Sequence, residues 1–345
     1  MPLALSRRRL MQLAAAMAIL PAVTEAKPMN EIRAIEGSWL DFHHPNPHDG
    51  DYWNGQTALF SCEQWQAKVN EMTAVGMRIL VVTSVALRGE AFYPSEVMRK
   101  RWTPLACADP IEAVLRAADE SGAGVFLGVG FFSEHTGDFA SQDPREQLGR
   151  QHVPLELARR YGHHRGFSGW YLPVEAPIQG HFPEAYVLYA RAMAERCRQA
   201  APGKPVLIAP YGTRTVADDR RFVEQLRALE VDYIAYQDEV GVEKTRVDEL
   251  DAIWARLRRL HDRARLPLWA DVELFRFEGP VYRSPLVPAP WERILAQLSA
   301  ASRYVDRILA YQYLGLMNPP DSPATAGHPS SVALYRAYAR WLQSR

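Results

Sequence analysis

Eight apolar runs alternate with eight longer amphipathic stretches along this chain, and this regular order is what most restricts its fold. The apolar runs span residues 33–42, 78–87, 124–131, 167–175, 205–212, 231–239, 267–275 and 306–314. Several are almost continuously hydrophobic, which is typical of parallel strands covered on both faces. Apolar residues recur at three- and four-residue spacing in the stretches 63–75, 110–121, 144–164, 183–200, 218–229, 248–263, 290–304 and 330–342, which are predicted helices.

Eight strand-then-helix units predict an α/β fold, a single closed (β/α)8 barrel of the TIM type. The 345 residues are enough for one such barrel, and no interruption is long enough for a second domain. A doubly wound open sheet is the main alternative, but no glycine-rich dinucleotide loop follows the first strand. We therefore assign residues 27–345 to the barrel and expect no cofactor.

Residues 1–26 precede this pattern and are predicted to be an export signal. Residues 6–11 read Ser-Arg-Arg-Arg-Leu-Met, the start of a twin-arginine pattern, and an apolar stretch follows up to residue 23. Residues 24–26 offer a small-residue cleavage site, and the stretch is short for a membrane span. A periplasmic or secreted location follows, with no stable membrane insertion after signal removal. An uncleaved anchor is the alternative.

The charge balance and the cysteine content restrict the classes of partner and of reaction that this chain can have. Forty basic and forty acidic residues cancel, so no overall field would attract nucleic acid or an anionic membrane. Cys62, Cys107 and Cys197 lack metal-type spacing and are expected to be free, with one disulfide formed after export as the alternative. No Gly-x-Ser-x-Gly elbow occurs, so the sequence does not favour a nucleophilic serine.

Polar residues collect where the predicted strands end, while the amino ends of the strands carry few acidic groups. In a (β/α)8 barrel the carboxyl ends of the strands form one face, and chemistry is found there. From these ends and the loops after them we predict the site residues Asp41, His43, Trp53, Tyr171, Glu175, Tyr211, Gln237, Asp238, Trp269, Asp271, Glu273, Tyr311 and Gln312. Pro-rich loops at residues 280–290 and 318–329 are expected on the same face.

Glu175 and Glu273 end the fourth and seventh strands, which places them across the barrel mouth from each other. A glutamate that ends an apolar strand is costly to bury unless it is paired or protonated. Glycoside cleavage needs two such groups, one to protonate the leaving oxygen and one to attack or activate water from the opposite face. We interpret the pair as catalytic. The alternative is a structural role in ion pairs with arginines such as Arg214 or Arg276.

At these residues the sequence resembles the superfamily of retaining glycoside hydrolases with catalytic glutamates on strands four and seven, the clan A barrels. The resemblance implies that Glu175 is the acid/base and Glu273 the nucleophile. That superfamily usually has Asn before the acid/base, where it bonds the sugar 2-hydroxyl, and Val174 stands there in this chain. The segments GWYLPVE, VDYIAYQDEVG and LWADVELF are also similar to a bacterial family of hydrolase-like barrels catalogued as a domain of unknown function. That similarity covers nearly the whole mature chain.

The leading interpretation is therefore an exported enzyme that cleaves a poly- or oligosaccharide, and two alternatives remain. His43, His44, His48 and Asp49 could make a metal-dependent hydrolase, but their spacing matches no standard zinc pattern, and a sugar-contacting loop is favoured with no metal. A carbohydrate-binding barrel without catalysis is the other, because of Val174. Trp53, Trp269 and Tyr311 are the candidate aromatic platforms for sugar rings.

Overall fold

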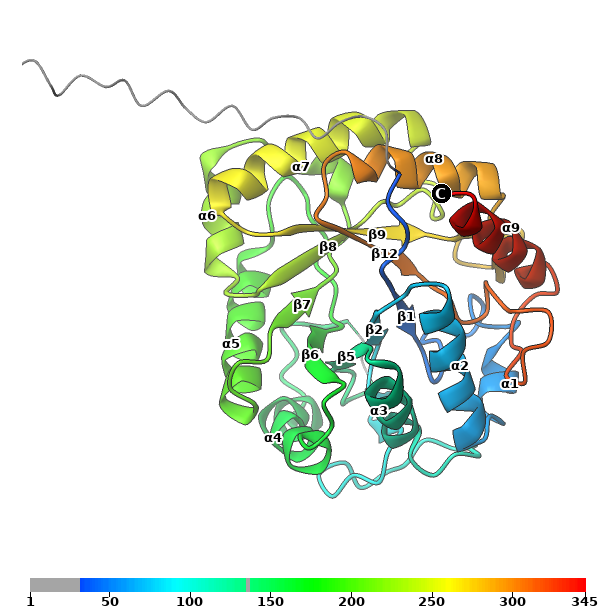
Figure 1. Ribbon diagram of the computed structural model, residues 1–345. Helices are drawn as coiled ribbons and strands as arrows, with labels where there is room; N and C mark the ends of the chain where they lie inside the picture. The colour runs from blue at the N-terminus through cyan, green and yellow to red at the C-terminus, as the bar shows by residue number, and fades with distance from the viewer. Residues whose placement is uncertain (1–31, 135–136) are drawn as a thin grey trace, which may run out of the picture. The chain divides into compact units, whose positions relative to one another are not determined.

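Eight parallel strands close into one barrel in the computed structural model, which describes residues 32–134 and 137–345 (Figure 1). The strands are β1 (Gly37–Leu40), β2 (Ile79–Val82), β5 (Gly124–Gly128), β6 (Phe167–Leu172), β7 (Val206–Ile208), β8 (Tyr233–Gln237), β9 (Leu268–Glu273) and β12 (Arg307–Tyr311). Each pairs with its neighbour in chain order, and β12 closes onto β1 through Gly37 and Leu309. The predicted (β/α)8 barrel is confirmed. The predicted export signal, residues 1–26, lies outside the described residues.

Helices run outside the strands and connect them. They are α2 (Cys62–Ala74), α3 (Pro110–Ser121), α4 (Pro144–Tyr161), α5 (Glu184–Ala200), α6 (Arg220–Ala228), α7 (Leu250–Ala264), α8 (Trp291–Ser302) and α9 (Ser331–Gln343). Their starts are fixed locally: Asp109 caps α3 by accepting from the Glu112 N–H, and Pro110 supplies a preset φ at the first position. Within the described residues no helix is long and apolar enough to cross a membrane.

Additional short helices and strands lie within the loops that follow the carboxyl ends of the barrel strands. They are helix α1 (Asn54–Thr57) and two antiparallel hairpins, β3 (Ala86–Leu87) with β4 (Glu90–Ala91) and β10 (Phe275–Phe277) with β11 (Leu286–Pro288). The predicted strands at 78–87 and 267–275 therefore end earlier than expected. Their last residues leave the barrel and build the loops around its mouth.

Side chains of the barrel strands alternate between two apolar layers, as the two-residue period requires. The larger layer lies between strands and helices. The smaller one fills the barrel interior and contains Trp39, Val81, Phe126, Tyr171, Leu207, Ala209, Ala235, Trp269 and Leu309. Trp269 stacks on Tyr233 there, with ring centroids 4.2 Å apart. This interior layer is the floor beneath the mouth of the barrel.

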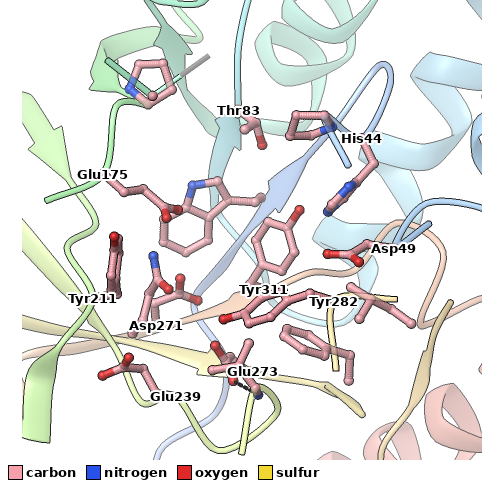
Figure 2. Close-up of a pocket in the computed structure, with 18 of the residues that line it drawn as sticks. His44, Asp49, Thr83, Glu175, Tyr211, Glu239, Asp271, Glu273, Tyr282 and Tyr311 are labelled. Atoms are coloured by element: carbon pink, nitrogen blue, oxygen red, sulfur yellow. Dashed lines mark hydrogen bonds between the residues drawn. The ribbon is translucent and has the colours of Figure 1, made fainter. Parts of the chain in front are cut away.

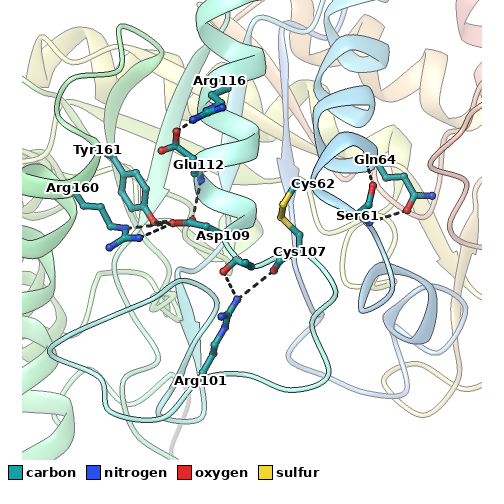
Figure 3. Close-up of a disulfide and its surroundings, with 11 residues drawn as sticks. Ser61, Cys62, Gln64, Arg101, Cys107, Asp109, Glu112, Arg116, Arg160 and Tyr161 are labelled. Carbon is teal, nitrogen blue, oxygen red and sulfur yellow. Dashed lines mark hydrogen bonds and ion pairs between the residues drawn. A yellow bond between two sulfur atoms is a disulfide. The ribbon is translucent and has the colours of Figure 1, made fainter.

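A disulfide joins two loops on the carboxyl-end side of the barrel (Figure 3). Cys62 begins α2, Cys107 lies just before α3, and their Cα atoms are 4.8 Å apart. The expectation of free cysteines was wrong for this pair, because 45 residues of sequence separate two positions that the fold brings together. Cys197 is free and buried, as expected.

Candidate active site

A cavity of about 570 Å³ opens at the carboxyl ends of the barrel strands (Figure 2). The residues that line it come from strand ends and from the loops that follow. Most are acidic or aromatic, namely Trp39, Asp49, Phe131, Tyr171, Glu175, Tyr211, Glu239, Asp271, Glu273, Phe275, Phe277, Tyr282 and Tyr311, and the polar others include His44, Gln237 and Lys244. The structure therefore brings together seven of the thirteen predicted site residues around one space, namely Tyr171, Glu175, Tyr211, Gln237, Asp271, Glu273 and Tyr311.

Glu175 follows β6 and extends into the cavity, where its side chain is exposed. The protein walls of the cavity raise its pKa to about 7, because they displace water around the carboxyl group and so disfavour its charged form. The amide of Gln237 and the charge of Lys244 act against this rise in the pKa, and the charge of Glu239 adds to it. A carboxyl group with this pKa carries a proton for part of the time at neutral pH, which suits a general acid.

Glu273 is the last residue of β9, in register with Tyr311 of β12, and its side chain is buried. Its Oε2 accepts a hydrogen bond of 2.9 Å from the Val242 N–H. Burial and the nearby charges of Asp238 and Glu239 raise the pKa of Glu273 well above its ordinary value. The backbone N–H groups of Val242 and Gly241 oppose this rise and stabilise the ionised form.

Asp238 is buried behind Glu273 and does not line the cavity, so of the successive acids Asp238 and Glu239 it is not the one that faces this space. Its Oδ2 accepts from Gln297 Nε2 at 2.6 Å, and its Oδ1 accepts from the Val240 and Glu273 N–H groups at 3.2 and 3.4 Å. Burial raises the pKa of Asp238 to about 6 against these donors. Its contacts make it a residue that positions Glu273.

Glu239 occupies the cavity wall in place of Asp238. Its φ of 56° lies in the left-handed region, which turns the chain as it leaves β8. Its Oε2 accepts from the Gly212 and Thr213 N–H groups at 2.9 and 2.8 Å, and Lys244 Nζ lies 3.8 Å from its Oε1. Strand alternation accounts for this, because Ala235, Gln237 and Glu239 share the inward side, whereas Asp238 points outward to Gln297 of α8.

Asp271 and Tyr311 line the inner wall of the cavity. Asp271 is buried, its Oδ1 has no hydrogen-bond partner in the described part of the chain, and burial raises its pKa well above the ordinary value. The Tyr311 hydroxyl donates to Asp41 Oδ2 at 2.9 Å. Asp41 and His43 line a smaller neighbouring pocket, so both lie beside the main cavity and not in it.

The predicted aromatic platforms are largely corrected by the structure. Trp53 is fully buried and meets the His44 ring edge-on, 5.7 Å between centroids, so no sugar can reach it. Trp269 lies in the barrel floor, and Gln312 is also fully buried. Tyr311 does line the cavity.

Two further aromatic lining residues were not predicted, one from a strand and one from a loop. Trp39 is the last but one residue of β1, and Tyr282 lies in the loop between β10 and β11, on the Pro-rich segment expected on this face. Tyr282 is 46% exposed, with its ring 5.7 Å from Lys244 Nζ. Aromatic residues near a predicted loop were the only signal, and they do not show which of them face inward.

The His43–Asp49 region does not gather metal ligands. Its His43 ring packs on Trp102, with centroids 4.6 Å apart, and burial lowers its pKa to about 4. Over residues 32–134 and 137–345, one group of three candidate ligands comes within 4.8 Å, formed by Glu112, His163 and His164 on the outside of the barrel. There His164 is hydrogen-bonded to Asp119 at 2.7 Å and to Glu112 at 3.0 Å.

Fold and cavity together define a (β/α)8 barrel with an acidic, aromatic-walled cavity at the carboxyl ends of its strands. Residues 35–324 match the family described as a domain of unknown function, DUF4434, and the chain belongs to that family. A comparison with curated proteins gave no match.

Solved structures with the same fold include a candidate alpha-L-fucosidase from Bacteroides thetaiotaomicron, 20% identical, with a TM-score of 0.70 over 90% of this chain and 94% of that one. A beta-galactosidase from Marinomonas ef1 is 14% identical, with a TM-score of 0.55 over 90% of this chain and 59% of that one. A beta-galacturonidase from Eisenbergiella tayi is 12% identical, with a TM-score of 0.55 over 90% and 51%. At these identities the likeness concerns the fold.

Proposed function

We propose that this protein is an exported glycoside hydrolase that cleaves a poly- or oligosaccharide by a retaining, two-glutamate mechanism. The observation that carries the proposal is that Glu175 and Glu273, from the ends of β6 and β9, line one cavity in different surroundings. Glu175 is exposed to the cavity with a pKa of about 7, and Glu273 is buried and held by a backbone N–H. Two carboxyl groups in different environments are what acid and nucleophile require.

In the first step Glu175 gives its proton to the glycosidic oxygen as the bond from that oxygen to the anomeric carbon breaks. The Glu273 carboxylate forms a bond to the same carbon, so a glycosyl–enzyme ester results and the leaving alcohol departs neutral. In the second step the Glu175 carboxylate takes a proton from water, whose oxygen replaces Glu273 at the anomeric carbon. Both glutamates return to their starting states.

In the superfamily that this sequence resembles, an Asn side chain precedes the acid/base. In this protein the amide near the acid/base is that of Gln237. Val174 is buried and cannot reach a sugar. Gln237 lines the cavity, lies close enough to Glu175 to lower its pKa, and donates from Nε2 to the Ala209 carbonyl at 3.1 Å. An amide close to the acid/base is thereby present, supplied from β8 and not from the residue before Glu175.

Two further observations support the proposal. The three similar structures are named for enzymes that act on glycosidic bonds, and the Bacteroides protein matches along nearly its full length. The Cys62–Cys107 disulfide suits a protein that works outside the reducing cytosol, in keeping with the signal predicted at residues 1–26.

Hydrolysis of a glycan panel by the mature chain tests the proposal, with Glu175→Gln and Glu273→Gln as inactive variants and Glu243→Gln as the matched control. Glu243 is an exposed residue near the cavity loop, so its variant should retain full activity. Proton NMR of the first-formed product should show the anomer of the substrate. Equal turnover by wild type and both inactive variants, or binding of a glycan with no turnover at all, would overturn the proposal; the latter would favour the non-catalytic binding barrel.

A further inference from the structure

The cavity carries far more acid than base. Among the described residues that line it, five have carboxyl groups, Asp49, Glu175, Glu239, Asp271 and Glu273, and one has an ammonium group, Lys244. Lys244 lies 3.8 Å from Glu239, so its charge is already opposed. An anionic sugar would therefore find one cation in this wall, already paired, whereas a cationic sugar would find several carboxyl groups that can match its charge.

Asp49 is the cavity acid that receives the least stabilisation from hydrogen-bond donors around it. It lies in the loop between β1 and α1, is 7% exposed, and its Oδ1 has no hydrogen-bond partner in the described part of the chain. Burial raises the pKa of Asp49, and the charges of His44 and His48 only partly oppose this. The Nδ1 atom of His44 is engaged elsewhere, since it lies 2.9 Å from the Asn46 carbonyl oxygen. A buried carboxyl group without a donor is costly unless a ligand completes it.

Asp271 shares these properties but stands among the reacting groups. Its Oδ1 also lacks a partner in the described part of the chain, and the charges of Glu273 and Glu175 act on it. In Figure 2 Asp271 lies on the same side of Tyr311 as Glu175, and Asp49 lies on the other side, next to His44. Asp49 therefore borders the cavity apart from Glu175 and Asp271.

We propose that the cavity selects a glycan with free, unacylated amino groups, and that Asp49 binds the ammonium group of one such sugar. The inference rests on the proposed function and names its substrate class. An ammonium group brings a positive charge and several N–H donors to Asp49, where a hydroxyl brings one donor and no charge. N-acetylation removes the charge of the amino group and adds bulk, so the acetylated sugar should bind more weakly than the amino sugar.

Calorimetric titration of the Glu175→Gln/Glu273→Gln double variant tests selection without turnover. The probes are tetrasaccharides of glucosamine and of galactosamine, each against its N-acetylated form, with a glucuronate-containing tetrasaccharide as the anionic probe. One amino form should bind about ten-fold more tightly than its acetylated form, and the anionic probe should bind most weakly. Equal binding of both pairs, or tighter binding of the anionic probe, overturns the inference.

Asp49→Asn and the same-loop control Asp51→Asn, both in the double variant, assign the site. Asp51 is exposed, so its variant should keep the full preference. Asp49→Asn should reduce the preference to about two-fold or less while binding of the acetylated probe stays unchanged. Equal weakening of binding for the amino and the acetylated probe, or an unchanged preference, contradicts the role of Asp49.

The two proposals can fail separately, because binding is the readout here. A wild type that selects amino sugars but cleaves nothing defeats only the proposed function. A wild type that cleaves neutral glycans without selection defeats only this inference.

Discussion

The two ends of the barrel hold their acidic residues in opposite ways. At the amino ends of three strands the acid directly before the strand pairs with an arginine: Glu36 with Arg307, Asp232 with Arg198 at 3.0 Å and Asp306 with Arg258 at 3.0 Å. Around the cavity at the carboxyl ends, Glu239 is the one lining acid with an ion pair in the described part of the chain. The pKa of Glu175 and of Glu273 is raised as a result of burial.

The difference teaches which acids maintain the barrel and which are available for chemistry. An acid with a basic partner is stabilised in its charged form, whereas buried acids without cations reduce stability and are retained where they serve a function. Acids occur at both ends of the strands, so their number alone separates the two ends less clearly than their pairing does.

Of the substitutions that test this difference between the two ends, Glu273→Gln should have the largest effect on activity. It should lower kcat/KM by about 10³-fold or more. It should also raise the free energy of unfolding by about 1 kcal/mol, because it removes the repulsion between Glu273 and Asp238. Steady-state kinetics measures the loss of kcat/KM, and urea unfolding measures the change in the free energy of unfolding. A variant that is both inactive and less stable would show that the contrast between the two ends is wrong.

Removal of the disulfide tests whether the carboxyl-end loops depend on a covalent link. Cys62→Ser/Cys107→Ser opens a loop of 45 residues and should reduce the free energy of unfolding by about 2–4 kcal/mol. Activity at low temperature should change little, since neither cysteine lines the cavity. Cys197→Ser, at a buried free cysteine, is the control for the substitution itself. Urea midpoints equal to that of the wild type would contradict the prediction.

Asp306→Asn tests the amino end. Asp306 Oδ2 accepts from the Leu268 N–H at 2.9 Å and pairs with Arg258, and the aspartate side chain is 44% exposed. The free energy of unfolding should fall by about 1 kcal/mol with kcat/KM unchanged. A marked loss of activity in a folded Asp306→Asn variant would mean that this end also serves catalysis.

The smallest effect expected is a shift of the pH profile in Lys244→Met. Glu175 must be protonated to act as the acid, so kcat/KM should fall as the pH rises through about 7. Lys244 lowers the pKa of Glu175, so its removal should move this limb to higher pH. The pH dependence of kcat/KM in both proteins measures the shift. Movement to lower pH would refute the assigned influence of Lys244.

The barrel could be predicted because eight repeats of the same pattern reinforce one another, and strand ends placed Glu175, Asp271 and Glu273 at the cavity for the same reason. Periodicity ends where a strand ends, so it could not place the residues that follow. Tyr282 reaches the cavity from the loop between β10 and β11, and Trp53 is covered by Gly315, whose φ of 82° lets the chain approach the indole. Contacts between distant loops, such as Cys62 with Cys107, have no local signal at all.

Trp39 in the barrel floor has a practical consequence. Of the tryptophans in the described residues, it is the one that lines the cavity, and its indole meets Tyr171 edge-on with centroids 5.9 Å apart. Indole emission depends on the polarity of its immediate surroundings, so a ligand that displaces solvent from the cavity should change the intrinsic fluorescence through this residue. The barrel thus contains its own optical reporter, and occupancy can be followed on unlabelled protein with glycans that carry no chromophore.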